Sequence, residues 1–366
     1  MIYNFKTIWE IASIGISSPL MYCGDIDKDN DVEILIPDVY GTLTAISGYS
    51  GKIKSRINVS NTNKINDIAV RDINNDGTNE IIIAVDREGI IIHNYLSDIQ
   101  HRIILPSSPI RLFFADIDRD GEDEIFSANI EGAIDIVKKN KVINRIYCNN
   151  PIYAVTFDDI NSDGTLELII YHDLAISIFH CHEELQLLDE LKMPFHPLAV
   201  SFKDIDNNKK KELIVLLDGK LMIFPDFPNL NYQKIDLFPK KITSFALSDI
   251  NLDNMYEYIL LCTDINQKSF LCIVNASGRL TYSRELHFVG LKIFTTDIDG
   301  DNRDEICIID ASGTKIHCLD LAKGDWYSAD VGSSILALRS IDLNADGQKE
   351  IIVKTSQKII AMALRE

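Results

Sequence analysis

The stretch DINNDGTNE, residues 72–80, places oxygen-bearing side chains at its first, third, fifth and ninth positions around a glycine. A tight loop turns alternate side chains towards a common centre, so these four can converge on one hard cation. A single stretch of this kind is equally consistent with an acidic turn, because Asp, Asn and Gly hydrogen-bond their own backbone in tight turns. The copies of the stretch help to separate the two interpretations.

The pattern occurs eight times along the chain. The other copies are DIDKDNDVE from Asp25, DIDRDGEDE from Asp116, DINSDGTLE from Asp159, DIDNNKKKE from Asp204, DINLDNMYE from Asp249, DIDGDNRDE from Asp297 and DLNADGQKE from Asp342. Successive copies start 47, 44, 43, 45, 45, 48 and 45 residues apart. A nearly constant period of this size indicates a repeat architecture. A glutamate ends every copy, and a turn alone does not require one.

Each repeat contains four short apolar segments. In residues 64–106 they are INDIAVRD (65–72), IIIAV (81–85), IIIHNY (90–95) and HRIIL (101–105), with turn residues between them. Such segments predict β-strands, and four of them form an antiparallel sheet that needs neighbours to cover both faces. Four strands per repeat favour a β-propeller blade over a β-solenoid coil. We therefore predict an all-β protein in which residues 1–366 form a single domain, an eight-bladed β-propeller of four-stranded antiparallel blades.

The two ends of the chain complement each other. The last repeat supplies SILALRSID (334–342), EIIVKT (350–355) and KIIAMAL (358–364), which makes three strands. The segment FKTIWEIAS, residues 5–13, is a spare strand before the first repeat. Placed as the outer strand of the last blade, it completes that blade and removes two exposed sheet edges. We predict that the N-terminal strand closes the last blade in this way.

Composition limits the classes of partner and compartment. The chain has 55 acidic and 36 basic residues and a formal charge of −19, so it repels phosphate backbones and we expect no nucleic acid partner. No apolar run approaches the ~18 residues of a membrane-spanning helix, so we expect no membrane span. The first residues lack the pattern of a signal peptide, and the seven irregularly spaced cysteines indicate free thiols. Both features favour the cytoplasm.

The repeated loops resemble those of the FG-GAP or VCBS repeat family, the calcium-loop propeller blades of integrin α-subunit heads. The likeness rests on the D-x-[DN]-x-[DN]-x-x-x-E loops followed by apolar strands, and it covers essentially the whole chain. The ninth residue is Glu where the family usually has Asp, and no FG or GAP triplet is evident. Most members work outside the cell, where calcium is abundant, so the resemblance and the missing leader disagree on compartment and leave it open.

The resemblance implies Ca²⁺ binding by the first, third, fifth and ninth side chains of several loops. Oxygen ligands without imidazole or thiolate suit Ca²⁺ better than Mg²⁺ or Mn²⁺. Such an ion has a structural role, because it holds the hairpin between the inner strands of a blade. The implied ligands are Asp25, Asp27, Asp29, Glu33, Asp72, Asn74, Asp76, Glu80, Asp116, Asp118, Asp120, Glu124, Asp159, Asn161, Asp163, Glu167, Asp249, Asn251, Asp253, Glu257, Asp297, Asp299, Asp301, Glu305, Asp342, Asn344, Asp346 and Glu350.

The eight loops are not equivalent. Glycine at the sixth position adopts a positive φ easily, and four loops have it, while Asn replaces it in three others. The loop from Asp204 to Glu212 has Lys209 there, and Asn208 supplies only a neutral ligand. We expect this loop to bind metal weakly or to stay empty, with its lysines partly replacing the cation.

No residue pattern marks an enzyme. The chain has no G-x-S-x-G, H-E-x-x-H or phosphate-loop motif. His180 and His182 share a strand face and His172 lies on the neighbouring strand, but zinc needs a fourth ligand that we do not find. Acidic residues such as Asp38, Asp264 and Asp310 recur in turns opposite the metal-type loops, where they are also ordinary turn formers.

We therefore expect a monomeric, non-catalytic module that binds a protein partner or acts as a scaffold. An acidic rim at those turns suits a basic segment of the partner. A carbohydrate ligand is the alternative, because propellers of the resembled family include polysaccharide lyases. A lectin-like sugar binder would need repeated exposed aromatic residues, which the turns do not show.

Overall fold

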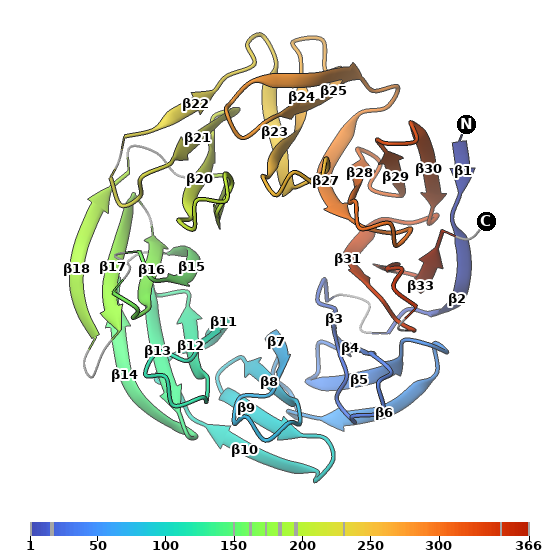
Figure 1. The fold of residues 1–366 in the computed structure, drawn as a ribbon. Helices are drawn as coiled ribbons and strands as arrows, with labels where there is room; N and C mark the ends of the chain where they lie inside the picture. The colour runs from blue at the N-terminus through green and yellow to red at the C-terminus, as the bar shows by residue number, and fades with distance from the viewer. Residues whose placement is uncertain are drawn as a thin grey trace. The chain divides into compact units, whose positions relative to one another are not determined.

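The chain folds as an all-β, eight-bladed propeller, as predicted, and each blade is a four-stranded antiparallel sheet (Figure 1). The structure is a computed structural model that describes residues 2–14, 18–148, 151–160, 163–172, 174–181, 185–193, 197–229, 231–344 and 346–364. No helix in this described part is long and apolar enough to cross a bilayer. The chain divides into two compact units, which we call the N-terminal unit (11–194) and the C-terminal unit (1–10 with 195–366). The single-domain organisation stays a prediction.

The N-terminal unit contains blades one to four, and the strands of each blade follow one another in sequence order. Blade one is β3 (Tyr22–Gly24), β4 (Glu33–Pro37), β5 (Thr42–Ser47) and β6 (Ile53–Asn58); blade two is β7 (Ile65–Arg71), β8 (Glu80–Val85), β9 (Gly89–Asn94) and β10 (Ile99–Ile103); blade three is β11 (Pro109–Ala115), β12 (Glu124–Asn129), β13 (Ala133–Lys138) and β14 (Lys141–Tyr147); blade four is β15 (Ile152–Asp158), β16 (Glu167–His172), β17 (Ala175–Cys181) and β18 (Leu185–Lys192).

The C-terminal unit contains blades five to eight. Blade five is β19 (Ala199–Lys203), β20 (Glu212–Leu217), β21 (Lys220–Phe224) and β22 (Gln233–Ile235); blade six is β23 (Lys241–Ser248), β24 (Glu257–Thr263), β25 (Ser269–Val274) and β26 (Leu280–Glu285); blade seven is β27 (Gly290–Thr296), β28 (Glu305–Asp310), β29 (Lys315–Asp320) and β30 (Asp325–Asp330); blade eight has β31 (Ile335–Ile341), β32 (Glu350–Thr355) and β33 (Lys358–Ala363).

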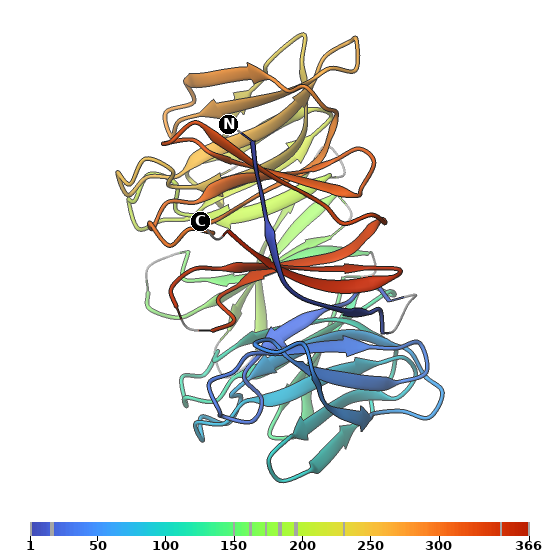
Figure 2. The same ribbon diagram turned by 90° about the vertical axis from the view of Figure 1, so that its right-hand side faces the viewer.

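The N-terminal segment completes the last blade, as predicted. Strand β2 (Lys6–Ala12) lies beside β33 in the sheet order β2-β33-β32-β31, and Lys358 Nζ contacts Glu10 Oε2 at 2.9 Å. The preceding strand β1 (Ile2–Asn4) adds a parallel fifth strand to β30 of blade seven, which the sequence did not indicate. Figure 2 shows this N-terminal segment running along the outer edges of both blades. It therefore covers the outer edges of two sheets of the same unit.

The second and third strands of each blade form the core. All six residues of β8 are buried, and alternate side chains enter different cores: Ile83 packs with Leu35 of blade one, whereas Ile82 packs with Ile125 of blade three. A strand that is buried on both faces reads as a continuous apolar run, which explains segments such as IIIAV. The fourth strands are largely exposed, for example β26 and β14. Neighbouring blades within each unit thus hold each other through paired sheet faces.

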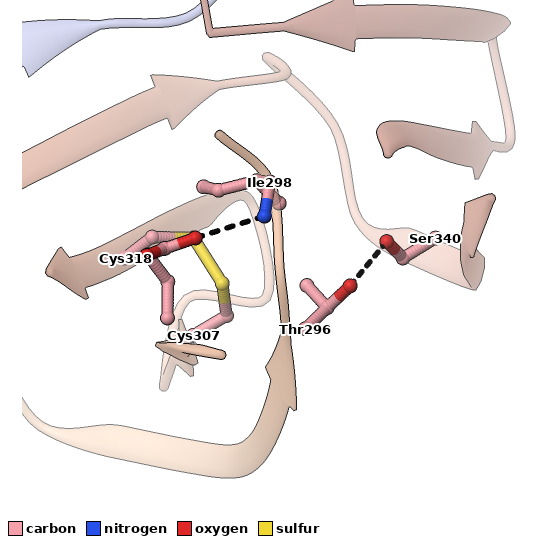
Figure 3. The surroundings of a disulfide bond; sticks show 6 residues. Thr296, Ile298, Cys307, Cys318 and Ser340 are labelled. Atoms are coloured by element: carbon pink, nitrogen blue, oxygen red, sulfur yellow. Dashed lines mark hydrogen bonds between the residues drawn. A yellow bond between two sulfur atoms is a disulfide. The ribbon is translucent and has the colours of Figure 1, made fainter. Parts of the chain in front are cut away.

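Two of the seven cysteines form a disulfide, which corrects the prediction that all are free thiols. Cys307 and Cys318 lie directly opposite each other on β28 and β29 and are bonded (Figure 3). They are 11 residues apart, and the hairpin between them sets the register that brings them together. Among the described residues no second disulfide joins the remaining cysteines, Cys23, Cys148, Cys181, Cys262 and Cys272. The thiol argument for the cytoplasm therefore no longer holds.

Candidate metal-binding loops

Each acidic loop joins the first strand of its blade to the second and is organised by its own carboxylates. In blade three Asp116 accepts hydrogen bonds from Asp120 N at 3.2 Å and Gly121 N at 2.9 Å. In all eight loops the fifth-position side chain also accepts a bond from the seventh-position N–H. The sixth residue has a positive φ throughout, from 66° at Asn30 to 90° at Gly164. The conformation expected for glycine is therefore common to every loop.

The ninth-position glutamate begins the second strand and is buried in every blade. One of its oxygens, Oε2, accepts a hydrogen bond from the backbone N–H of the second loop residue. The eight donors are Ile26, Ile73, Ile117, Ile160, Ile205, Ile250, Ile298 and Leu343. The glutamate thus has a structural task that needs no metal, so its repetition alone is weaker evidence for a cation than the sequence suggested. The partner of the other oxygen, Oε1, differs from blade to blade.

In blade one a lysine ammonium meets this second oxygen. Lys54, on the fourth strand β6, places Nζ 2.6 Å from Glu33 Oε1, 2.8 Å from Asp29 Oδ2 and 3.0 Å from Asp27 Oδ2. Burial lowers the pKa of Lys54, but hydrogen bonds with Asp29, Glu33 and Asp27 outweigh it and raise the pKa above the usual range. A positive charge from the chain therefore lies among the predicted ligands.

Blade three contains a second ammonium of this kind. Lys138 ends the third strand β13, and its Nζ lies 2.8 Å from Glu124 Oε1, 2.9 Å from Asp120 Oδ2 and in contact with Asp118. The pairing of Ile125 with Val137 places Lys138 opposite Glu124 across the hairpin. The residue at this cross-strand position is therefore the one that reaches the loop.

The same cross-strand position differs in the other blades of the N-terminal unit. In blade two Asn94 pairs with Glu80 and donates to its Oε1 at 3.1 Å. In blade four His180 pairs with Glu167, with Nδ1 3.1 Å from Oε1. His172, which the sequence grouped with His180, instead contacts Ser177 Oγ at 2.7 Å, and His182 lies outside the described residues. The histidines do not gather into a zinc site within the described part of the chain.

Blade five brings the acidic side chains of its loop together, and the expectation that its lysines partly replace the cation stays a prediction. One ligand atom each of Asp204, Asp206 and Glu212 lies within 4.8 Å of the others. Glu212 Oε1 is buried and has no hydrogen-bond partner among the described residues. Burial raises the pKa of Glu212 to about 7, the Ile205 N–H opposes this, and Asp206 and Asp204 add to it. An unpartnered carboxylate oxygen beside two aspartates fits a hard cation, so the geometry indicates an open site here.

Blade seven has a strongly perturbed glutamate beside a lysine. Burial raises the pKa of Glu305 to about 8; the Ile298 N–H opposes this, and nearby carboxylates including Asp299 and Asp320 add to it. Lys323 lies in the turn after β29, with Nζ 3.0 Å from Asp320 Oδ2 and in contact with Asp299. Among the described ion pairs, the ammonium pairs with the loop residue Asp299 and with Asp320 at the end of β29, but not with Glu305.

The structure brings many of the predicted ligands together. Asp25, Asp27 and Asp29 offer oxygens within 4.8 Å of one another, as do Asp116, Asp118 and Asp120. Blade four combines Asp163 and Glu167 with His180, while Asn161 lies outside the described residues. In blades two, six and eight the third-position amide instead donates to a carboxylate, from Asn74 to Asp76, from Asn251 to Glu257 and from Asn344 to Asp346. Metal binding by these 28 residues stays a prediction.

The sequence did not indicate that Lys54, Lys138 and His180 reach the loop glutamates. The pairing of the second and third strands gives a signal for Lys138 and His180, because both lie opposite the glutamate in a short hairpin. Lys54 gives no such signal, since it reaches the loop from the fourth strand. Its position follows only from the three-dimensional blade.

The opposite ends of the blades carry the turns where we expected an acidic rim. Asp38 accepts bonds from Tyr40 N and Thr42 N, both at 2.8 Å, and Asp264 accepts from Asn266 N and Lys268 N, both at 2.9 Å. These carboxylates therefore form turns, as the simpler interpretation holds.

Comparison with solved structures agrees with the blade geometry. A crystal structure of BBS1N in complex with ARL6DN superposes with a TM-score of 0.57 and 10% identity, covering 100% of this chain and 98% of that one. The C-terminal WD40 domain of Sif2 superposes with a TM-score of 0.65 and 16% identity, covering 100% of both chains. BamB from Moraxella catarrhalis superposes with a TM-score of 0.61 and 11% identity, covering 98% of this chain and 100% of that one.

The chain is a β-propeller. At these identities the likeness shows the fold alone, and it extends to a computationally designed protein, Ika8, with a TM-score of 0.67 and 10% identity over 98% of this chain and 100% of that one. No protein-family model and no curated protein matches the sequence.

Proposed function

We propose that this propeller is a non-catalytic binding module that holds a protein partner at one end of its blades. The proposal rests on large apolar side chains that are exposed at the turns between second and third strands and at the connections to the next blade. Because successive strands are antiparallel, these turns and connections share the end of each blade opposite the acidic loops. Exposed apolar groups gathered at one place are typical of interaction surfaces.

In the N-terminal unit this end carries Tyr40, Ile104 and Ile130, which are 71%, 85% and 75% exposed. Arg87 and Glu131 lie in the same set of turns and give the surface polar neighbours. Apolar contacts bordered by polar groups are the usual composition of a protein interface.

In the C-terminal unit the corresponding end carries Phe238 and Ile265, which are 88% and 80% exposed. Asp218, Asp264 and Asp310 lie in turns at this end, and the whole chain has a formal charge of −19. An amphipathic segment with basic residues complements both properties, so a partner of that chemistry is favoured.

Calcium in several loops would stabilise the blades that present this surface. The oxygen ligands of the loops and their likeness to FG-GAP repeats support the ion, and the unpartnered Glu212 Oε1 with Asp204 and Asp206 supports it in blade five. An ion that binds the folded chain and not the unfolded chain raises the free energy of unfolding by mass action. These residues would hold the ion, and the partner would bind at the other end of the blades.

A titration of the isolated partner tests the binding surface. The partner is captured from the source cell, purified and titrated against the wild type, Phe238→Asp, Ile265→Asp and the control Leu280→Asp, whose side chain is exposed on the outer strand β26. We expect the first two variants to bind at least about tenfold more weakly, the loss of a buried apolar anchor, and the control to bind normally. Equal binding by all four would contradict the proposal, and cleavage of a polysaccharide would favour the carbohydrate alternative.

A further inference from the structure

We propose that Lys54 and Lys138 are built-in cations that take the place of a divalent metal ion in blades one and three, so that these two loops exclude metal. The inference rests on the proposed calcium role of the other loops for its biological meaning. Its evidence is separate, because it concerns ammonium groups that the structure places among the loop carboxylates.

The ammonium of Lys54 has the surroundings of a bound cation. Its contacts with Glu33, Asp29 and Asp27 are 2.6–3.0 Å long, and Asp31 Oδ2 lies at 3.8 Å. Glu33 is fully buried, and the Lys54 side chain is itself only 21% exposed. One nitrogen is thus shared by carboxylates from the third, fifth, seventh and ninth positions of the loop.

The ammonium of Lys138 occupies the equivalent place in blade three by a different route. It comes from the end of the third strand, whereas Lys54 comes from the fourth strand. It contacts the third-, fifth- and ninth-position carboxylates Asp118, Asp120 and Glu124. Two side chains from non-equivalent positions therefore converge on the same point of two loops.

Such an ammonium is incompatible with a metal ion at the same centre. Calcium binds oxygen at about 2.3–2.6 Å, which is close to the distances at which the lysine nitrogens already lie from these oxygens. A second cation at that centre would be in contact with the ammonium and strongly repelled by it. The lysine neutralises part of the negative charge of the loop. This neutralisation does not depend on free calcium.

Blade five shows the contrasting arrangement. Strand β21 ends at Phe224, and the next residue, Pro225, offers no side-chain donor across the hairpin from Glu212. Glu212 Oε1 accordingly lacks a hydrogen-bond partner within the described part of the chain. The presence or absence of a cationic side chain thus distinguishes loops with otherwise similar backbone hydrogen bonds.

Counting bound calcium in lysine variants tests the inference. The full chain is equilibrated with Ca²⁺, and the ions per chain are counted by native mass spectrometry for the wild type, Lys54→Met, Lys138→Met and the double variant. We expect one additional ion in each single variant and two in the double variant. Lys54→Arg keeps the charge, and Lys141→Met removes an exposed lysine at the start of strand β14, so both should bind the wild-type number.

The outcomes separate this inference from the proposed calcium role. If the wild type binds calcium and the methionine variants gain none, the lysines do not exclude metal and the inference is wrong, while the calcium role stands. If the wild type binds none but each variant gains one, the calcium role fails and the inference holds. A methionine variant that unfolds without metal should refold when Ca²⁺ is added, and failure to refold would also overturn the inference.

Discussion

Lys54 and Glu33 form an ion pair in blade one, with Nζ 2.6 Å from Oε1, and the glutamate is completely buried. Removing the lysine leaves several carboxylates together without their counter-charge. We expect Lys54→Met to lower the free energy of unfolding by roughly 2–3 kcal/mol in chelator, between the values for exposed and buried pairs. Urea denaturation measures the change, and Lys54→Arg should keep most of the stability. A loss no greater than that of the exposed control Lys52→Met would contradict this interpretation.

The bond from Leu343 N to Glu350 Oε2, 2.8 Å long, represents the glutamate contact found in all eight blades. Glu350→Ala leaves that buried N–H without an acceptor and should cost about 2–3 kcal/mol of stability without any metal. Glu350→Gln keeps an acceptor oxygen and should cost less. Thermal unfolding in chelator compares both with the exposed control Lys349→Ala. Identical melting temperatures for Glu350→Ala and the control would rule out the structural role of this glutamate.

The repeat period and the alternation of apolar segments were enough to predict the blades. Segments such as IIIAV are continuously apolar because their side chains enter two cores. A short β-branched run without proline is typical of a strand that is buried on both faces. Residues 5–13 were placed correctly because the last repeat lacks a strand. The parallel addition of β1 to blade seven was not predictable, since three residues carry no periodic pattern.

The contents of the loops were only partly predictable. The recurrence of Asp and Glu correctly located the loops, but Lys54 reaches its loop from a strand whose register the sequence does not reveal. Lys209 adopts the positive φ that the sixth loop position requires, and the expectation that its loop binds metal weakly stays a prediction.

The disulfide between Cys307 and Cys318 gives a chemical prediction. In urea without reductant, five of the seven cysteines should react with a thiol reagent, and all seven should react after reduction. A link between residues 11 apart should contribute about 3 kcal/mol by restricting the unfolded chain. Reduction should therefore lower the melting temperature, and Cys307→Ser should make the protein insensitive to reductant. Seven reactive thiols before reduction would contradict the pairing.

The pKa values of Glu212 and Glu305 predict how stability depends on pH in metal-free protein. Both are raised, to about 7 and about 8, mainly by burial, above the ordinary value of 4.5. The folded state therefore holds more protons than the unfolded state in this window, and stability falls as pH rises from 5.5 to 8.5. Between pH 5.5 and its raised pKa of about 7, Glu212 should account for about 2 kcal/mol of the decrease.

Urea denaturation in chelator at the two pH values measures this effect. Glu212→Gln cannot ionise at this position and should show a smaller decrease than the wild type. Added Ca²⁺ should recover stability at pH 8.5, where the carboxylates are ionised and free to bind it. A rise in stability between pH 5.5 and 8.5 in chelator would have the wrong sign for buried glutamates.

The most direct test of the account is a crystal structure of the protein grown with calcium, with anomalous diffraction used to locate the ions. We expect a peak about 2.3–2.6 Å from oxygens of Asp204, Asp206 and Glu212. We expect no peak beside the ammonium groups of Lys54 and Lys138. The absence of a peak from all eight loops, or a calcium ion in place of the ammonium of Lys54 or Lys138, would contradict these expectations.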